Sequence, residues 1–381
     1  MLREAMHWET LMQCAQFAVR RTDRMLVAEL RGAHRVLSTS ACNGGQTDAV
    51  RFLLNHQSCE GGGDHERLRQ ITEIGHERYH ERTCGHAGIP ADATASMGTA
   101  ANMHYACISR HEDAGVAVTA VVTAGVEANA TCAGDPATWR ETAAGIERVP
   151  ECGGTINTML LVGAPLTAAA LARAVVTMTE GKTAALQRLA VRSRQSPDLA
   201  TGTGTDQYCV AAPLEGPLVL TSTSAHVKLG ELIGRATREA TLESLRWQNG
   251  LEPSYTRGVL HALGRYGLAE RTFIEDMRPL LGPQDLELLA GNSKAVLYEP
   301  LVGAAAHALA TVLDRIRHGA VPASVERDAC AQCAATLAAN VSGRSDRWPQ
   351  YRAMLLERSG GPKDLILAAL ALGWSEKWRS A

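Results

Sequence analysis

The sequence predicts an α/β fold, a layered α+β core with a mixed sheet, followed by an additional all-helical C-terminal module. Up to about residue 245, short apolar or β-branched runs alternate with helical patterns, which is typical of sheets covered by helices. Many of the connections are short, so we expect a mixed sheet rather than a purely parallel one. Beyond that point, apolar residues recur every three or four positions and no strand-like run follows.

Six runs in the first part read as strands because they are short, apolar or β-branched, and bounded by Gly, Pro or Asn. They are Met25–Leu30, Arg35–Ser40, Val116–Thr123, Met159–Val162, Gln207–Ala212 and Leu218–Thr221. Four patterns between them have helical spacing. They are Thr47–Leu54, Glu66–Glu73, Met97–Arg110 and Thr167–Thr179. Residues 1–24 mix charged with apolar side chains, so we expect an amphipathic N-terminal helix before the core.

A linker signal divides the chain at Trp247–Ser254, where Asn249-Gly250 and Pro253 interrupt the helical pattern. The apolar spacing then predicts helices over Tyr255–Tyr266, Thr272–Leu281, Pro283–Ala290, Pro300–His318, Val325–Val341, Tyr351–Arg358 and Pro362–Leu372. Polar residues directly after Pro283 and Pro362 suit helix starts. We therefore predict an N-terminal helical extension over 1–24, a core domain over 25–247 and a helical domain over 255–381.

The charge balance argues against two classes of partner. The 381 residues carry a formal net charge of −2, with 20% charged and only 4% aromatic residues. A basic excess would point to nucleic acid, and a tight Lys/Arg cluster to a membrane surface, but the sequence has neither. No apolar run approaches the ~20 residues that span a bilayer, and the N-terminus lacks the uninterrupted apolar stretch of a signal peptide. We therefore expect a cytoplasmic protein without a nucleic-acid or membrane partner.

The 10 cysteines are scattered along the chain, and we expect them to be free thiols in a reducing compartment. Cys330 and Cys333 form a Cys-x-x-Cys pair, but a structural zinc site needs four ligands and no second pair accompanies this one. The pair also lies in an alanine-rich run, 329–339. We interpret both cysteines as small packing residues of a helix, with a redox or metal role as the alternative.

The run Ala-Thr-Gly-Thr-Gly-Thr-Asp at Ala200–Asp206 is the most informative motif. It alternates hydroxyl side chains with glycines and ends on a carboxylate. Glycine lacks a Cβ, so backbone N–H groups in such a loop can approach a ligand closely. A loop of this kind can cradle an anion or the oxyanion of a reacting carbonyl. The alternative is a plain glycine-rich turn.

Other motifs accompany this loop in a fixed order along the chain. They are Cys42–Gly45, Gly98–Ala101, Val122–Gly125, Gly153–Thr158, Glu180–Ala185 and Thr223–Gly234. Taken in that order, the series from about Arg24 to about Leu245 resembles the adenosylcobinamide amidohydrolase family of cobalamin-salvage enzymes. No single motif decides the resemblance; the pair of Ala200–Asp206 and His226–Gly234 contributes most.

The resemblance implies hydrolysis of the amide that joins the corrin side chain of adenosylcobinamide to aminopropanol, or to its phosphate, giving adenosylcobyric acid. The partner is then a small-molecule substrate, and the corrinoid is substrate only, with no cofactor. Two alternatives remain: an amidohydrolase of the same fold for a different small amide, and a corrinoid- or metal-binding protein without catalysis. We favour a homodimer as the assembly, because closed two-fold dimers are the commonest.

The catalytic candidates are Asp206, His226, Lys228, Thr203 and Thr205. His226 follows a Thr-Ser-Thr-Ser run and lies between a predicted strand and the helix that follows it. Histidine is the side chain best suited to move a proton near pH 7. Asp206 can orient His226, act as a base for water, or cap the next element. One of the threonines can be the nucleophile if a base lies within about 3 Å.

The substrate-binding candidates come from the other motifs of the series. Asn43, Gly44 and Gly45 form a turn whose amide groups suit recognition of an oxyanion or amide, with a simple Asn-Gly turn as the alternative. Glu180 and Lys182 follow a buried helix and face either the site or solvent. The remaining candidates are Thr201, Gly202, Gly204 and Asn157.

We predict no metal, but one segment offers an alternative. Histidines at 65, 76, 80 and 86 gather between Gly61 and Gly88. His76 and His80 have i, i+4 spacing, which would place both rings on one helix face. The sequence between them reads His-Glu-Arg-Tyr-His, so they do not form the His-Glu-x-x-His motif of zinc proteases.

Overall fold

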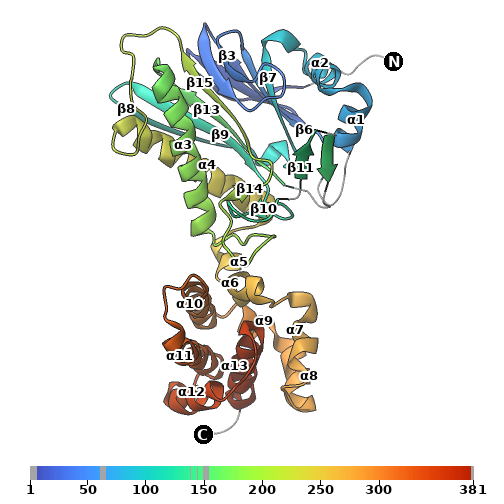
Figure 1. The fold of residues 1–381 in the computed structure, drawn as a ribbon, viewed down its shortest axis with the longest axis vertical. Coiled ribbons are helices and arrows are strands. Elements are labelled where there is room, and N and C mark those ends of the chain that lie inside the picture. Colours follow the sequence, from blue (N-terminus) through green and yellow to red (C-terminus); the bar gives the residue numbers. More distant parts are fainter. Residues whose placement is uncertain (1–6, 61–65, 138, 144, 149–153, 379–381) are drawn as a thin grey trace. The chain divides into compact units, whose positions relative to one another are not determined.

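The computed structural model describes residues 7–60, 66–137, 139–143, 145–148 and 154–378. The chain divides into two compact units, Met1–Leu251 and Glu252–Ala381. Figure 1 shows sheets and helices in the first unit and helices in the second. This arrangement confirms the predicted fold class.

Five strands of the first unit form a sheet in the order β1-β2-β3-β6-β7. They are β1 (Glu9–Gln13), β2 (Phe17–Arg21), β3 (Met25–Leu30), β6 (Phe52–Gln57) and β7 (Thr94–Thr99). β7 runs parallel to β6, whereas the other neighbours are antiparallel. A parallel pair needs a crossover connection, and this one contains α1 (Glu66–Ile74) and α2 (His76–Ala87).

Six strands form a second sheet in the order β5-β4-β15-β13-β9-β8. They are β4 (His34–Ser38), β5 (Gly45–Thr47), β8 (Cys107–Asp113), β9 (Val116–Ala124), β13 (Ile156–Val162) and β15 (Gln207–Pro213). β13 and β15 are parallel and the other pairs are antiparallel, so the sheet is mixed. Two small antiparallel pairs lie outside it: β10 (Ala130–Thr131) with β14 (Gly202–Thr203), and β11 (Trp139–Thr142) with β12 (Gly145–Arg148).

The two sheets stack face to face and helices cover their outer faces (Figure 1). Leu53 of β6 packs with Met159 of β13 in a core shared by both sheets. The next residue, Leu54, packs with Cys84 of α2 on the opposite face of the first sheet, as the two-residue period of a strand requires. On the far face of the second sheet, another core joins its strands to α3 (Ala168–Arg188) and α4 (Lys228–Asn249). The first unit therefore has four layers, α-β-β-α.

The second unit consists of short and long helices around a core of its own. They are α5 (Pro253–Thr256), α6 (Val259–Leu263), α7 (Glu270–Met277), α8 (Pro283–Asn292), α9 (Lys294–Leu297), α10 (Pro300–Arg317), α11 (Ala323–Ser342), α12 (Trp348–Leu356) and α13 (Pro362–Lys377). Phe273, Tyr351 and Trp374 are its largest fully buried side chains. Cys330 and Cys333 of α11 pack in or against this core, which fits the packing role expected for them.

Four predicted elements are wrong. The expected N-terminal helix is a β-hairpin, β1–β2, from residue 9 onward, and residues 1–6 lie outside the described part. The hairpin extends the first sheet through β3, because Phe17 and Val19 gain burial in the core between the sheets. The expected helices Thr47–Leu54 and Met97–Arg110 are replaced by strands β6, β7 and β8, and Leu218–Thr221 forms only an isolated bridge at Leu220.

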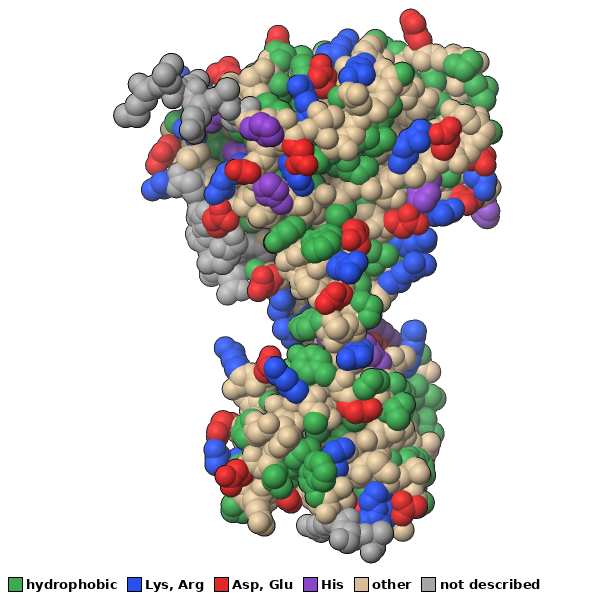
Figure 2. Space-filling view, turned by 180° about the vertical axis from the view of Figure 1, so that it is seen from behind, with side chains coloured by type: hydrophobic (Ala, Val, Ile, Leu, Met, Phe, Trp, Pro, Cys, Tyr) green, Lys and Arg blue, Asp and Glu red, His purple; other side chains and the backbone are tan. Residues whose placement is uncertain are grey.

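The described helices include none that is both long and apolar enough to cross a bilayer. On the face seen in Figure 2, acidic and basic side chains are interspersed over each unit.

Candidate functional site

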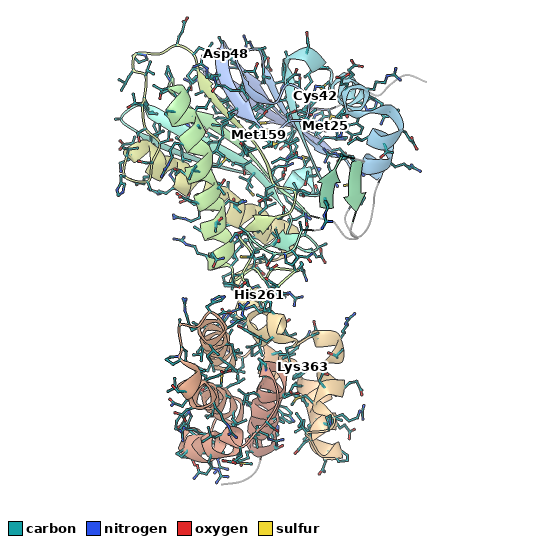
Figure 3. The ribbon with its side chains drawn as sticks, viewed as in Figure 1. Met25, Cys42, Asp48, Met159, His261 and Lys363 are labelled. Atoms are coloured by element: carbon teal, nitrogen blue, oxygen red, sulfur yellow. The ribbon has the colours of Figure 1, made fainter. Side chains whose placement is uncertain are left out.

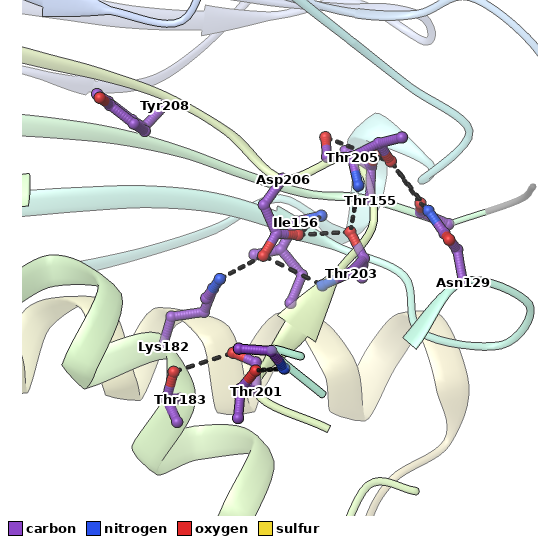
Figure 4. A network of polar contacts seen from close by, with 12 residues as sticks. Asn129, Thr155, Ile156, Lys182, Thr183, Thr201, Thr203, Thr205, Asp206 and Tyr208 are labelled. Carbon is purple, nitrogen blue, oxygen red and sulfur yellow. Dashed lines mark hydrogen bonds and ion pairs between the residues drawn. The ribbon is translucent and has the colours of Figure 1, made fainter. Parts of the chain in front are cut away.

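Three connections of the first unit meet at one end of the second sheet. β9 ends at Ala124, while its neighbours β13 and β15 begin at Ile156 and Gln207. β9 is antiparallel to β13, so the chain leaving β9 and the chain entering the other two strands lie at the same edge. The loop Ala200–Asp206 belongs to this group, and its contacts are drawn in Figure 4.

Asp206 is the centre of the polar network at this edge (Figure 4). Lys182, on the last turns of α3, forms an ion pair with its Oδ2 atom. The Thr203 hydroxyl donates to Oδ1 at 2.5 Å, and the Thr203 N–H donates to Oδ2 at 3.2 Å. A fourth donor is the backbone N–H of Ile156, at 3.1 Å from Oδ1. The side chains of Lys182 and Asp206 are only 13% and 20% exposed, so the pair is largely shielded from water.

Two glycines of the loop leave room for these side chains. A Cβ on Gly202 would lie 2.5 Å from Asp206 Oδ2 and 2.7 Å from Lys182 Nζ. A Cβ on Gly204 would lie 2.9 Å from Oδ1 of Asn129. Their role here is therefore close approach of side chains, because a Cβ at either position would collide with Asp206, Lys182 or Asn129.

Thr205 lies at the rim of the network, where its residue is exposed. Its hydroxyl contacts the hydroxyl of Thr155, donates to Gly154 O at 3.0 Å and accepts from Asn129 Nδ2 at 3.1 Å. Sequence reasoning missed Thr155 and Asn129 as site residues. Thr155 belongs to the motif Gly153–Thr158 and directly precedes the strand β13. The first residue of that motif lies outside the described part. Asn129 carried no signal in any of the motifs.

Thr201 holds the loop in place rather than facing the network. Its hydroxyl accepts the Ala133 N–H at 2.8 Å, and its carbonyl accepts the Thr183 hydroxyl at 2.9 Å. Ala133 lies two residues after β10, and Thr183 belongs to α3. We infer a supporting role for this residue.

Asn157 lies one residue beyond Ile156 and points to the opposite face of the sheet. Its side chain is buried between the two sheets, where Nδ2 donates to Asn55 Oδ1 at 2.8 Å and to Gly98 O at 3.2 Å. Asn55 in turn donates to the Thr123 hydroxyl at 2.8 Å. Asn157 pairs with Gln207, the residue after Asp206, in the β13–β15 register, but its side chain belongs to an inter-sheet polar cluster on the other side of the sheet from the Asp206 network.

The turn at Asn43 is a structural element in this fold. Asn43 Nδ2 donates both of its hydrogens, to Ala91 O and Thr94 O, each at 2.8 Å. The residue has a φ of 55°, and a Cβ on Gly44 would lie 1.9 Å from Ser40 O. Gly45 has a φ of +74°, in the left-handed region that favours glycine. These contacts match the alternative of an Asn-Gly turn, because the amide donors are already used.

His226 and Lys228 lie toward the other end of the second sheet. The neighbouring Thr223 donates to Ala170 O at 2.8 Å, in the first turn of α3. Its carbonyl also accepts the Thr177 hydroxyl at 2.8 Å. Lys228 lines a hollow together with Asp113 and Val116 at the β8–β9 turn, which is the end of β9 opposite Ala124. His226 is exposed, and Lys228 pairs with Glu231 at 2.6 Å in the first turn of α4. The structure thus does not bring His226 or Lys228 to Asp206.

Glu180 is exposed on α3, two residues before Lys182. Positions two apart on a helix face different directions, so Glu180 does not share the direction of Lys182 toward Asp206. Of the predicted candidates, the structure therefore brings together Thr203, Thr205, Asp206 and Lys182, with Gly202 and Gly204 beside them.

The histidine segment does not form a metal centre in the described part of the chain. Within those residues, no group of three or more His, Cys, Asp or Glu side chains is placed to hold a metal ion. His80 uses both ring nitrogens, because Nε2 contacts Ala91 O and Nδ1 contacts Ser96 Oγ, each at 2.9 Å. His65 lies outside the described residues. The i, i+4 pair of His76 and His80 is therefore not arranged as a pair of ligands.

Comparison with known proteins identifies the family. The sequence model described as adenosylcobinamide amidohydrolase matches residues 9–253, which include every residue of the Asp206 network. The chain belongs to this family. A protein of Methanocaldococcus jannaschii, described as uncharacterized protein MJ1613, is 35% identical over 243 residues, covering 60% of this chain and 88% of that protein.

The solved structures include the PH0078 protein from Pyrococcus horikoshii OT3. The match has a TM-score of 0.30 and 11% identity, and covers 62% of this chain and 82% of that one. A likeness at this level carries no argument about fold or function.

Proposed function

We propose that this member of the adenosylcobinamide amidohydrolase family hydrolyses the amide between the corrin side chain and aminopropanol. The products would be adenosylcobyric acid and the free amine. Two findings support the proposal: the family match covers nearly the whole first unit, and Asp206 holds a hydroxyl and an ammonium group at the same carboxylate. The second finding is the reason for placing the reaction at Asp206.

Hydrolysis of an unactivated amide needs an activated oxygen nucleophile, a group that stabilises the tetrahedral oxyanion, and a proton for the leaving amine. Asp206 is the general base in this proposal and takes the proton from the attacking oxygen. It then returns that proton to the departing nitrogen, so the net change is the addition of one water across the C–N bond. Lys182 supplies positive charge beside the developing oxyanion.

The attacking oxygen is either the Thr203 hydroxyl or a water that the same carboxylate activates. In the first route the amine leaves as an ester forms on Thr203 Oγ1, and a water that gives its proton to Asp206 then hydrolyses this ester, which releases the acid and restores the hydroxyl. Thr203 already donates its proton toward Asp206 at 2.5 Å, which is the geometry of a nucleophile with its base. Two substitutions separate the routes. Thr203→Ser keeps a hydroxyl, whereas Thr203→Val removes it at similar volume.

The experiment incubates the full chain with adenosylcobinamide and follows adenosylcobyric acid by mass spectrometry, with and without a chelator. We expect product in both cases. The acyl-enzyme route predicts that Thr203→Val abolishes product while Thr203→Ser retains it; the water route predicts that Thr203→Val retains measurable turnover. Thermal unfolding of each variant shows whether the loop still folds.

Three outcomes would contradict the proposal. Turnover of other small amides without turnover of adenosylcobinamide would indicate a redirected substrate. Tight corrinoid binding without any product would indicate a binding protein, and Asp206 substitutions should then leave binding unchanged. Product lost only with the chelator would contradict the metal-free reaction described above.

A further inference from the structure

A cavity of about 150 Å³ lies between the strands β6 and β7 and the helices α1 and α2, and Gln207, the residue that follows Asp206, also lines it. It is enclosed by α1, α2, the carboxyl ends of the parallel strands β6 and β7, and the loop before β5. Cys42, labelled in Figure 3, stands in that loop, and its thiol contacts His76 O at 3.9 Å. Gln207 reaches the cavity from β15 and accepts the Gly98 N–H at 3.0 Å. The reaction proposed above does not use this cavity.

The side chains that line the cavity include basic residues and no acidic ones among the described residues. The described residues around the cavity include one arginine and three histidines, but no aspartate or glutamate. They also include neutral hydrogen-bonding side chains such as those of Tyr79, Ser96 and Gln207. A concave site with cationic and neutral donors and no lining carboxylate suits a negatively charged group.

Arg67, from α1, is the cation of this cavity. Its guanidinium lies directly over Gly98, since a Cβ on that glycine would be 2.4 Å from Arg67 Cζ and 2.5 Å from Nη1. Its Nε atom is buried and has no hydrogen-bond partner. Within the described part of the chain, no acidic side chain forms an ion pair with Arg67. A guanidinium that is held in a cavity with an unused donor is a site for an oxyanion.

His56 lines the same cavity as Arg67, and the positive charge of Arg67 acts on its imidazole. Burial and the positive charges of Arg67, Arg24 and His86 lower its pKa to about 4, so the imidazole is neutral at pH 7. Its Nδ1 atom is 3.5 Å from the Tyr79 hydroxyl. A neutral imidazole can still donate one hydrogen bond, which adds a donor without adding charge.

We propose that this cavity is a binding subsite for a small oxyanion, a carboxylate or a phosphate group, held by Arg67 over Gly98 with help from His56 and Tyr79. The chemical class is shared by two sources: a carboxylate on a substrate or product, and a phosphate ester. The inference does not depend on the proposed amide hydrolysis, because binding can be measured without turnover.

The test is direct binding of inorganic phosphate, and separately of acetate, to the full chain by isothermal titration calorimetry. Arg67→Gln should weaken binding at least tenfold. Arg69→Gln is the matched control, since it removes the same charge from the same helix at an exposed position outside the cavity, and should change binding less than twofold. Tighter binding of phosphate than of acetate would identify a phosphate ester as the source, and the reverse a carboxylate.

Gly98→Ala provides a second variant that keeps every charge. The added Cβ would displace the guanidinium, so binding should fall as it does in Arg67→Gln, while circular dichroism shows a folded chain. A bound oxyanion should also raise the pKa of His56, which the histidine NMR signals would follow. Absence of binding up to about 10 mM, or equal affinity in Arg67→Gln and Arg69→Gln, would overturn the proposal.

Discussion

At the scale of single residues, the ion pair of Lys182 and Asp206 organises the site. It is largely buried, and three further donors, including the Thr203 hydroxyl, converge on the same carboxylate. Breaking a buried pair by removing one partner is costly because the other charge is left uncompensated. A substitution here therefore affects both the fold of the loop and the proposed chemistry, and the two effects need separate measurements.

His226→Ala tests whether the reaction centre is at Asp206 or at the start of α4. His226 is exposed and lies two residues before Lys228, which lines a hollow with Asp113 and Val116 at the β8–β9 turn, the end of the second sheet opposite the Asp206 network. We predict turnover of adenosylcobinamide within twofold of wild type, because His226 touches none of the reacting groups. A loss of 100-fold or more in kcat with an unchanged melting temperature would place the chemistry at His226 instead.

The sequence allowed prediction of part of this site. The loop residues Thr203, Thr205 and Asp206 were predicted from one motif, and their proximity follows from local chain geometry. His226 was predicted to join Asp206, yet β15 lies between the two positions in the chain. A strand of its seven residues spans about 23 Å, so residues before and after it lie at opposite ends of the sheet. The prediction from motifs failed for His226 because it did not take the length of the intervening strand into account.

At the scale of elements, α3 and α4 cross closely on the second sheet. A Cβ on Gly181 of α3 would lie 2.8 Å from Gly234 O of α4 and 3.3 Å from Thr237 Cβ. A Cβ on Gly234 itself would meet no atom within 4 Å. The two glycines thus stand at the same crossing, but only Gly181 is required by the packing.

This difference predicts opposite effects of the same substitution. Gly181→Ala should destabilise the first unit by about 1–3 kcal/mol, because the added methyl group forces the helices apart. Gly234→Ala should stabilise it by about 0.5–1 kcal/mol, the usual gain in a helix interior. Urea denaturation followed by circular dichroism measures both, and equal shifts in the two variants would contradict the described crossing.

Two of the mispredicted elements, the N-terminal helix and Met97–Arg110, share a physical cause. Residues 9–21 contain Leu, Met and Ala, and residues 97–110 contain Met and Ala, which favour helices when taken locally. Pairing with neighbouring strands overrides that preference, since β1, β2, β7 and β8 complete the two sheets. The helices α10 and α11 were predicted well, because long periodic patterns with prolines at their starts specify their own structure.

At the scale of the whole molecule, each unit has its own hydrophobic core. All residues of the Asp206 network and of the Arg67 cavity belong to the first unit. A chain that ends at Leu251 should therefore fold and keep its turnover number. Comparison of kcat for this chain and for the full protein checks the prediction; a truncated chain that folds but has no activity would show that the helical unit takes part in the reaction.

The most direct test of the central claim compares two carboxylate-to-amide substitutions in the full chain. Asp206→Asn removes the proposed base, whereas Glu231→Gln makes the same change in an exposed ion pair with Lys228, away from Asp206. With adenosylcobinamide as substrate, we predict that Asp206→Asn lowers kcat by a factor of about 10² to 10⁴ and Glu231→Gln leaves it unchanged. Full activity of a folded Asp206→Asn protein would contradict the assignment of the reaction to this carboxylate.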